Sequence, residues 1–363
     1  MSQTIILSTM GQLYPTKFLP YMTNSELVNQ IAGRENKITP LGQRQQFLVG
    51  SELRRRYISE DKLLGADKYV VGELYLLAPQ FGPGIQSVQA QSMGLYPANN
   101  QNDLTEWQQG NAVPPIEGAD FSQWQAELGE KALPFGLNTF PINQYGRAAD
   151  YILSLDEHNC PYFNENWQQQ VSTINTTWVD FVNANGDAAT KQIIQGSTIQ
   201  EVCDFTQWAW VSYVDLNSQD SFDWLRTNVC EGFFQQMNEA QASLSAQMDN
   251  VVSNGFMGYV DTALSSKDHL YHSMVPIDSY HMYTLTQAIS ADQIDSAYVA
   301  PASVLMINEY SDHTIKTFFN DVEVTPIGCT AGQPCSKKDF KGALKAKIGQ
   351  VDVPSYCNSN TKN

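Results

Sequence analysis

The stretch TPLGQRQQFLVGSELRRRY at residues 39–57 predicts a helix with well-defined ends. Thr39 can accept a hydrogen bond from the free N–H groups of the first turn, and Pro40 suits the first helical position. Four apolar residues fall roughly on one face of this helix, which predicts that this face is the one that packs on the core. They are Leu41, Phe47, Leu48 and Leu53. The arginines at 54–56 stand near the helix end, where cations meet the helix dipole favourably, so we interpret them as structural.

Strands and helices alternate on either side of this segment. Residues 4–8 are short and β-branched, which predicts a buried first strand that a loop with Gly11 and Pro15 ends. Residues 70–77 predict a second strand, and residues 87–95 predict the next helix. Such strand–loop–helix units predict an α/β fold, a three-layer sandwich with a mainly parallel sheet. Ligand sites in these sheets gather at the carboxyl ends of the strands.

The character of the sequence changes between residues 121 and 253. Gln and Asn become frequent there, and helical patterns dominate, as at residues 233–252. We therefore expect a mainly helical cap at residues 121–253, inserted in an α/β core made of residues 1–120 and 254–363. The tryptophans of this range are interpreted as core residues rather than as a ligand cage. They are Trp124, Trp167, Trp178, Trp208, Trp210 and Trp224.

The composition excludes several classes of partner. The chain has 363 residues and a formal net charge of −17, with a pI near 4.6. Nucleic acid and anionic membranes are poor partners for such a chain, because a phosphate backbone needs clustered Lys and Arg. No apolar run approaches the roughly 18–20 residues of a membrane helix, and the first residues show no signal-peptide pattern.

Six cysteines are spread along the chain without a CxxC pair, so a zinc site has little support. An even count favours disulfides, with the pairing left open, and the less favoured alternative is six buried free thiols. Asn175, in the sequence Asn-Thr-Thr, is a candidate glycosylation site. We expect a secreted glycoprotein of an oxidising compartment, meaning the extracellular space, the cell surface or a lysosome-like lumen, with any signal peptide already removed.

The segment at residues 39–57 closely resembles the signature helix of the histidine acid phosphatases, of the lysosomal and prostatic type. Residues 73–97 (ELYLLAPQFGPGIQSVQAQSMGLYP) resemble the family segment Arg-Thr-x-x-Ser-Ala-Gln-Ala…Gly-Leu-Tyr-Pro. Residues 159–163 (NCPYF) resemble the family's Asn-Cys-Pro-x-Phe. The resemblance covers essentially the whole chain and implies the phosphoglycerate mutase-like α/β sandwich.

The resemblance also implies how the cysteines pair. Cys357 stands where the family bonds back to the cysteine of the Asn-Cys-Pro motif, here Cys160. Cys329 and Cys335 resemble a short family disulfide loop. Cys203 and Cys230 would then pair within the cap, although Cys230 lies earlier than its family equivalent.

The residues that carry the family's reaction are replaced in the first motif. Those enzymes read Arg-His-Gly-x-Arg-x-Pro after the first strand, and the His is the nucleophile. The same place here reads TMGQLYP at residues 9–15. Met10 replaces the nucleophile, and its thioether cannot form the phosphohistidine-like intermediate. Thr9 and Leu13 replace the two arginines, whose guanidinium groups match the geometry of phosphate.

Two further motifs are degenerate as well. Pro83 stands where a third phosphate-binding Arg is expected, and the family's His-Asp motif reads Ile277-Asp278, so that the acid Asp278 survives alone. His272 and His281 flank this segment and are the histidines that could replace the nucleophile, although a structural His is far more common. The remaining histidines are His158, His269 and His313. No metal or cofactor site is expected.

Three hypotheses follow. The first is a catalytically inactive acid phosphatase homologue with a structural, binding or assembly role, acting through a protein partner or through self-association into a homodimer or a larger assembly. The second is a repurposed pocket that binds a small apolar or neutral ligand, which requires the old cavity to be open rather than collapsed. The third is an active acid phosphatase that hydrolyses phosphate monoesters, which requires the three motif assignments to be wrong.

Overall fold

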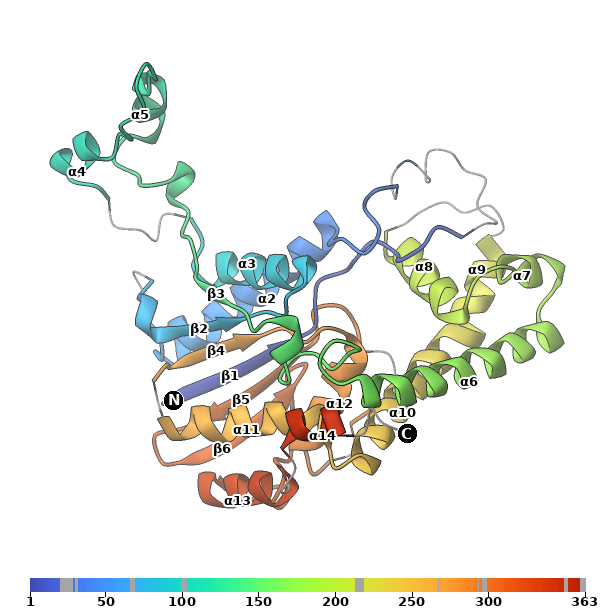
Figure 1. Cartoon of the computed structure of the whole chain (residues 1–363). Helices are drawn as coiled ribbons and strands as arrows, with labels where there is room; N and C mark the ends of the chain where they lie inside the picture. Colours follow the sequence, from blue (N-terminus) through green and yellow to red (C-terminus); the bar gives the residue numbers. More distant parts are fainter. Residues whose placement is uncertain are drawn as a thin grey trace.

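The computed structural model describes residues 1–19, 29, 32–65, 69–98, 103–212, 219–266, 268–292, 294–295, 299–348 and 352–359. Its centre is an eight-stranded sheet with the order β3-β2-β4-β1-β5-β6-β7, and β8 pairs with β6 (Figure 1). The strands are β1 (Gln3–Ser8), β2 (Leu74–Leu77), β3 (Ile142–Asn143), β4 (Tyr271–Met274), β5 (Val304–Glu309), β6 (Thr314–Phe319), β7 (Val322–Val324) and β8 (Cys335–Ser336).

The sheet has a parallel half and an antiparallel half. Strands β3, β2, β4 and β1 are joined by parallel pairs, whereas β5, β6, β7 and β8 are joined to the sheet by antiparallel pairs. Every residue of β1 and β4 is buried, as parallel strands covered on both faces require. The predicted α/β fold is confirmed, and the antiparallel half is an addition that the sequence pattern did not indicate.

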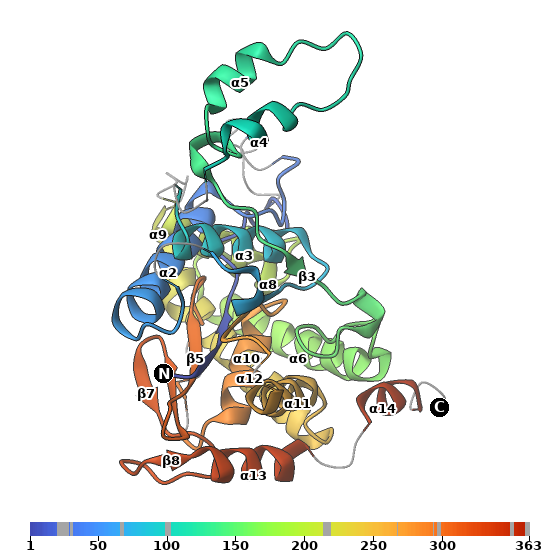
Figure 2. The same ribbon diagram turned by 90° about the vertical axis from the view of Figure 1, so that its left-hand side faces the viewer.

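Helices cover both faces of the sheet and complete the three layers (Figures 1 and 2). Ile6 of β1 belongs to the buried cluster of the α2–α3 face, whereas Ile5 and Leu7 belong to the cluster of the opposite face. This alternation is the two-residue period of a strand buried on both sides. The helices of the two faces are α2 (Pro40–Arg54), α3 (Gly82–Leu95), α11 (Val251–Ser266), α12 (Ser279–Ile289) and α13 (Lys337–Ile348).

A separate group of helices lies at one end of the sheet and packs around its own apolar cluster (Figure 1). These helices are α6 (Pro161–Asn185), α7 (Ala188–Ile193), α8 (Ile199–Val211), α9 (Gln219–Leu225) and α10 (Glu231–Gln247), with α14 (Val353–Ser359) beside α6. The expected cap range, 121–253, contains α6–α10 but also β3, which joins the sheet. The domain boundary therefore stays a prediction.

Residues 103–136 form an arm that stands away from the body (Figures 1 and 2). The arm carries α4 (Glu106–Asn111) and α5 (Ser122–Leu128). The arm also contains a short 3₁₀ turn at Pro134–Gly136, and further 3₁₀ or π-helical turns lie at Arg55–Glu60, Val71–Glu73, Arg147–Ala149 and Arg226–Cys230. Within the described residues, no helix combines the length and the apolarity that crossing a membrane would need.

Three element boundaries differ from the sequence prediction. The second strand is confined to Leu74–Leu77, because a 3₁₀ turn takes up the preceding residues. Helix α3 begins at Gly82, five residues before the predicted start at residue 87. The helix predicted at 233–252 is two helices, α10 and α11, separated where Asp249 and Asn250 adopt left-handed backbone angles (φ 55° and 57°).

The structure contains three disulfides, and no cysteine is free. They join Cys160 to Cys357, Cys203 to Cys230 and Cys329 to Cys335, the pairs that the family resemblance implied. The first of these connects the start of α6 to α14 across 197 residues. Disulfides of this number indicate an oxidising, extracellular-type compartment.

The ends of α2 follow the prediction. Thr39 accepts from the N–H of Gly42 at 2.9 Å, and Pro40 occupies the first turn. At the other end, Arg55 and Arg56 both form ion pairs with Glu52, so the basic cluster is structural.

The buried face of α2 differs from the prediction. Phe47 and Leu48 are 40% and 58% exposed, and Leu41 is exposed as well. Leu53 is the one predicted apolar residue of the face that is buried, and its buried neighbours are Gly42, Gln46 and Gly50. The expected apolar face of α2 is therefore wrong.

The close contact between α2 and α3 is the physical reason. A Cβ atom on Gly50 would lie 1.9 Å from the carbonyl oxygen of Gln91 in α3, and one on Gly94 would lie 2.0 Å from the carbonyl oxygen of Phe47. At this separation the two backbones touch, and only glycine fits between them. The periodicity of apolar residues does not report such a contact.

We expect the substitution Gly50→Ala to lower the free energy of unfolding by at least about 2 kcal/mol, because the added methyl group forces the two helix backbones apart. Urea unfolding followed by circular dichroism measures this change. The control is Gly110→Ala in α4, where a Cβ meets nothing within 4 Å. Equal stability of the two variants would contradict the close contact between α2 and α3.

Candidate functional site

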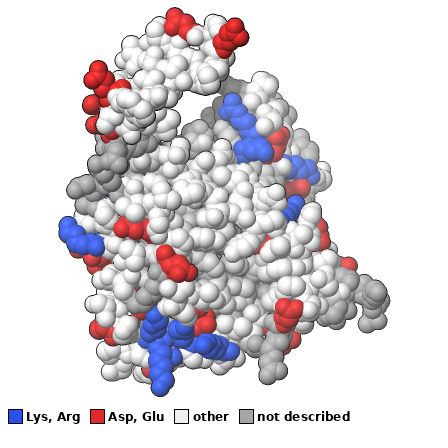
Figure 3. Space-filling view, turned by 60° about the vertical axis from the view of Figure 1, so that its left-hand side comes forward, with Lys and Arg blue, Asp and Glu red and all other residues white. Residues whose placement is uncertain are grey.

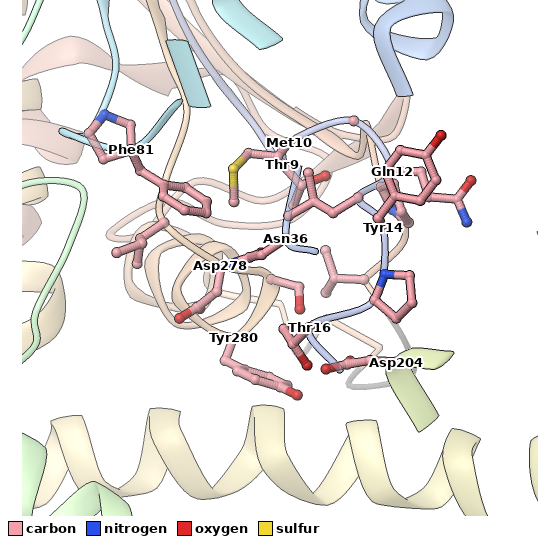
Figure 4. Close-up of a pocket in the computed structure, with 18 of the residues that line it drawn as sticks. Thr9, Met10, Gln12, Tyr14, Thr16, Asn36, Phe81, Asp204, Asp278 and Tyr280 are labelled. Atoms are coloured by element: carbon pink, nitrogen blue, oxygen red, sulfur yellow. The ribbon is translucent and has the colours of Figure 1, made fainter. Parts of the chain in front are cut away.

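A cavity of about 500 Å³ opens at the carboxyl ends of the parallel strands (Figure 4). The loops that follow β1, β2 and β4 supply Thr9, Pro79 and Ile277 to its wall. Helix α8 forms another part of the wall. The cavity therefore lies where ligand sites of parallel sheets are expected. Other residues that line it are Gln12, Tyr14, Thr16, Asn36, Phe81, Arg147, Asp150, Ser154, Asp204, Trp208, Phe234 and Tyr280.

The structure brings most of the predicted site residues together at this cavity. Thr9, Met10, Leu13, Ile277 and Asp278 all line it. The exception is Pro83, which is buried in the first turn of α3 and does not line the cavity. Phe81 lines the wall in its place, so the β2–α3 loop presents a ring rather than a cation.

The hydroxyl of Thr9 makes two hydrogen bonds within the protein. Its Oγ1 donates to the carbonyl oxygen of Ala300 at 2.8 Å and accepts from the N–H of Ser303 at 2.8 Å. Both bonds hold the loop after β1 against the segment before β5. Thr9 therefore holds this loop in place, and its hydroxyl is not free to bind a ligand.

The backbone N–H groups of the same loop are also occupied. Gly11 donates to Oγ of Ser87 at 3.2 Å, and Gln12 donates to Oε1 of Gln45 at 3.0 Å. Free N–H groups in a loop of this kind are what holds a phosphate in anion-binding sites. In this loop the N–H groups of Gly11 and Gln12 are already bonded to protein side chains, so they are not free to bind an anion.

Asp278 caps α12 at the edge of the cavity. Its carboxylate accepts from the N–H of His281 at 2.6 Å. The positive end of this helix thus already carries a negative group of the protein, which leaves less attraction for an external anion.

Neither of the two candidate replacement histidines reaches the cavity. His281 is buried behind it, and burial lowers the pKa of its imidazole. His272 lies in β4 between Gln3 and Tyr259, 3.1 Å and 2.6 Å from its ring nitrogens, and burial lowers its pKa to about 4. All five histidines are described, and none lines the cavity.

Two carboxylic acids that the sequence analysis missed line the cavity. Asp150 is 1% exposed, and its Oδ1 accepts from the N–H of Leu153 at 2.9 Å. Its Oδ2 has no hydrogen-bond partner among the described residues, and burial raises the pKa of this carboxyl. Asp204 forms no hydrogen bond or ion pair with a described residue. Burial raises the pKa of Asp204 to about 7, and the nearby Glu201 adds to the rise.

Gln12 and Trp208 complete the polar and aromatic lining. Gln12 is 4% exposed, and neither its Oε1 nor its Nε2 has a partner among the described residues. Trp208 lines the cavity and has its ring 6.0 Å from that of Tyr14. The interpretation of the tryptophans as core is confirmed for Trp167 and Trp208, which are buried in the apolar cluster of the helical group, and it is wrong for Trp124 and Trp210, which are exposed.

Arg147 is the single Lys or Arg side chain that lines the cavity within the described part of the chain, and it is ion-paired. Its Nε donates to Oδ2 of Asp156 at 2.7 Å, and its Nη2 lies 3.4 Å from Glu157. Asp156, Glu157 and His158 bring possible metal-ligating atoms within 4.8 Å of one another. The two carboxylates already bind Arg147, so we assign no metal to this group.

Asn175 lies within α6. Its Nδ2 donates to the carbonyl oxygen of Val171 at 2.9 Å, and its Oδ1 accepts from the N–H of Gln200 at 3.2 Å. Both ends of the amide are thus used inside the protein, and glycosylation of Asn175 stays a prediction.

We expect Asp204→Asn to raise the melting temperature by at least about 2 °C at pH 7–8 and to leave it unchanged near pH 4. The folded-state pKa is raised, so the unfolded chain ionises first as pH rises from about 4 to about 7, and stability is lost over this range. The asparagine amide does not ionise, so the variant does not undergo this loss of stability. Thermal unfolding at both pH values measures the effect.

The control for this experiment is Asp180→Asn, the same change of charge at an exposed position of α6. An equal gain for Asp204→Asn at pH 4 and pH 8, or a gain matched by the control, would contradict the burial of the Asp204 carboxyl.

Comparison with solved structures finds this fold in phytases. The phytase from Citrobacter braakii is 13% identical, with a TM-score of 0.56 and with 98% of this chain and 99% of that chain covered. Hafnia alvei phytase is 10% identical, with a TM-score of 0.58 and 98% of each chain covered. No family model matches the sequence.

A further similar structure is the Bifidobacterium longum multiple inositol polyphosphate phosphatase. It is 11% identical, with a TM-score of 0.52 and with 97% of this chain and 93% of that chain covered. At these identities the similarity is one of fold, and it extends over the whole chain.

Proposed function

We propose that this chain is a catalytically inactive relative of the histidine acid phosphatases whose cavity binds a small ligand other than a phosphate ester. The observation that carries the proposal is an open cavity, at the position expected for the phosphatase site, whose lining by the described residues includes no histidine and no unpaired Lys or Arg. The motifs shared with the lysosomal and prostatic type, together with the phytase-like fold, support this origin. We retain residues 121–253 as the proposed cap over that cavity.

The lining is unfavourable for a phosphate. Met10, Leu13 and Ile277 replace groups that would compensate its charge, and Asp204 and Asp278 add carboxyl groups to the same wall. Moving a dianion from water into such surroundings costs roughly several kcal/mol with no compensating ion pair. Phosphate binding should therefore fail together with turnover.

The volume of the cavity supports a retained binding role. A site that had lost all function could fill with its own side chains, but about 500 Å³ remains open here. Small-molecule sites typically measure roughly 300–1,000 Å³. The open cavity thus favours a binding protein over a purely structural body.

We expect no release of p-nitrophenol from p-nitrophenyl phosphate between pH 4 and pH 8, and no rise in melting temperature with inorganic phosphate. An active histidine acid phosphatase assayed in parallel shows that the conditions permit turnover. Activity that vanishes in Asp278→Asn would overturn the proposal, because it would mean that the surviving acid still serves a phosphatase reaction.

The arm supports a second role, in assembly. Trp107 and Phe135 are 77% and 81% exposed, and Ile116 and Trp124 are also largely exposed. Large apolar side chains grouped on a projecting segment are typical of interaction surfaces. Figure 3 shows the arm standing clear of the body with acidic side chains on its surface. We infer that the arm contacts a protein, in the simplest case a second copy of this chain.

We expect the native chain to sediment above its monomer mass of 40.6 kDa at concentrations of about 10 µM, and Trp107→Ser with Trp124→Ser to return it to the monomer. Burial of these rings against another protein is the reason. Analytical ultracentrifugation measures both masses. The control is Trp210→Ser, an exposed ring on α8 outside the arm. A native monomer would contradict self-association.

A further inference from the structure

Carboxyl groups dominate the charge of the cavity. Asp150, Asp204 and Asp278 line it, and Arg147 is already paired with Asp156. Figure 4 shows Asp204 beside Thr16 and Tyr280, with Asp278 across the same space. The wall that in the phosphatase family would carry cations for an anion thus carries acids.

Two aromatic side chains line the same cavity as the unpaired acid. Asp204 and Trp208 are one helical turn apart on α8, so both side chains face the cavity from the same side of the helix. Tyr14 extends this surface, with its ring 6.0 Å from that of Trp208. A cavity lined by a carboxylate and by electron-rich rings can attract an ammonium group, through both charge and cation–π interaction.

Buried polar atoms without partners give an independent indication of a ligand. The side chain of Gln12 and Oδ2 of Asp150 are almost fully buried and unbonded among the described residues. A buried polar group left without a hydrogen bond destabilises the folded state. A ligand that brings N–H or O–H groups into the cavity would satisfy them.

We propose that the cavity binds an organic cation, a small molecule with an ammonium group held by Asp204 and by the rings of Tyr14 and Trp208. This inference rests on the proposed function, because it names the ligand class of the same site. A neutral polyol could use the amides and the rings, but it would leave the carboxylates without compensation. A cation compensates them, which is why the charge of the wall favours it.

Two pairs of probes of matched shape test the proposal. Choline is compared with 3,3-dimethylbutan-1-ol, which has a carbon in place of the nitrogen, and cyclohexylamine is compared with cyclohexanol. Isothermal titration calorimetry at pH 8 measures each affinity. We expect at least one cation to bind about tenfold more tightly than its neutral partner, or more.

The variants localise the effect. Asp204→Asn should weaken binding of the cation by about tenfold and leave the neutral partner unchanged, whereas Trp208→Leu should weaken both. Asp180→Asn, an exposed acid of α6, is the control for the change in net charge. An equal loss in Asp180→Asn would mean that the cation is attracted by overall charge rather than by the cavity.

The remaining outcomes separate the two proposals. Neutral probes, or a sugar such as glucose, that bind as tightly as the cations would overturn the cation assignment and leave the proposed binding role standing. No binding of either cation up to about 10 mM would also overturn the cation assignment. Saturable binding of inorganic phosphate in the cavity would overturn the proposed function itself.

Discussion

The backbone-to-backbone contact between α2 and α3 is the constraint on which the site depends. Gly50 and Gly94 let the two helices touch, and the same closeness continues toward the cavity, where a Cβ on Gly11 would lie 2.1 Å from the carbonyl oxygen of Gly42. The loop after β1 is therefore held directly on the first turn of α2. Thr9, with its bonds to Ala300 and Ser303, fastens the other side of the loop. Steric contact and hydrogen bonds, rather than a bound ligand, give this loop its shape.

In this arrangement, the contacts that shape the cavity are made by other groups than those that determine its charge and polarity. The frame consists of glycine contacts, helix caps and buried strands, none of which requires a cation or a histidine at the cavity wall. The wall can therefore change from an anion-binding composition to an acidic one without loss of the fold. The raised pKa of Asp204 reflects the cost of a carboxyl in this wall, since it is partly withdrawn from water without a partner among the described residues.

Local signals predicted much of the frame. The Thr39-Pro40 start of α2, the first strand and the three-layer α/β architecture are confirmed, and the family resemblance supplied the three disulfide pairs. Features that depend on tertiary contact were missed. The apolar pattern of α2 does not reveal that α3 approaches its glycines, and nothing in the spacing of Trp208 shows that this core side chain also lines a cavity. Asp204 stands among apolar residues in EVCDFTQWAW at residues 201–210, which is a signal that could have identified it.

The bond between Cys160 and Cys357 has a consequence for the covalent continuity of the molecule. It closes a ring that includes α8, which carries Asp204, and the start of α12, which Asp278 caps. The loop with Met10 lies outside the ring, and packing and hydrogen bonds hold it against the rest of the fold. A protease that cuts one exposed loop between residues 160 and 357 would open the ring without separating the chain into pieces. A nicked molecule would keep both sides of the cavity on one connected chain, and its fragments would part only after the sulfur bridge had been reduced and the fold undone.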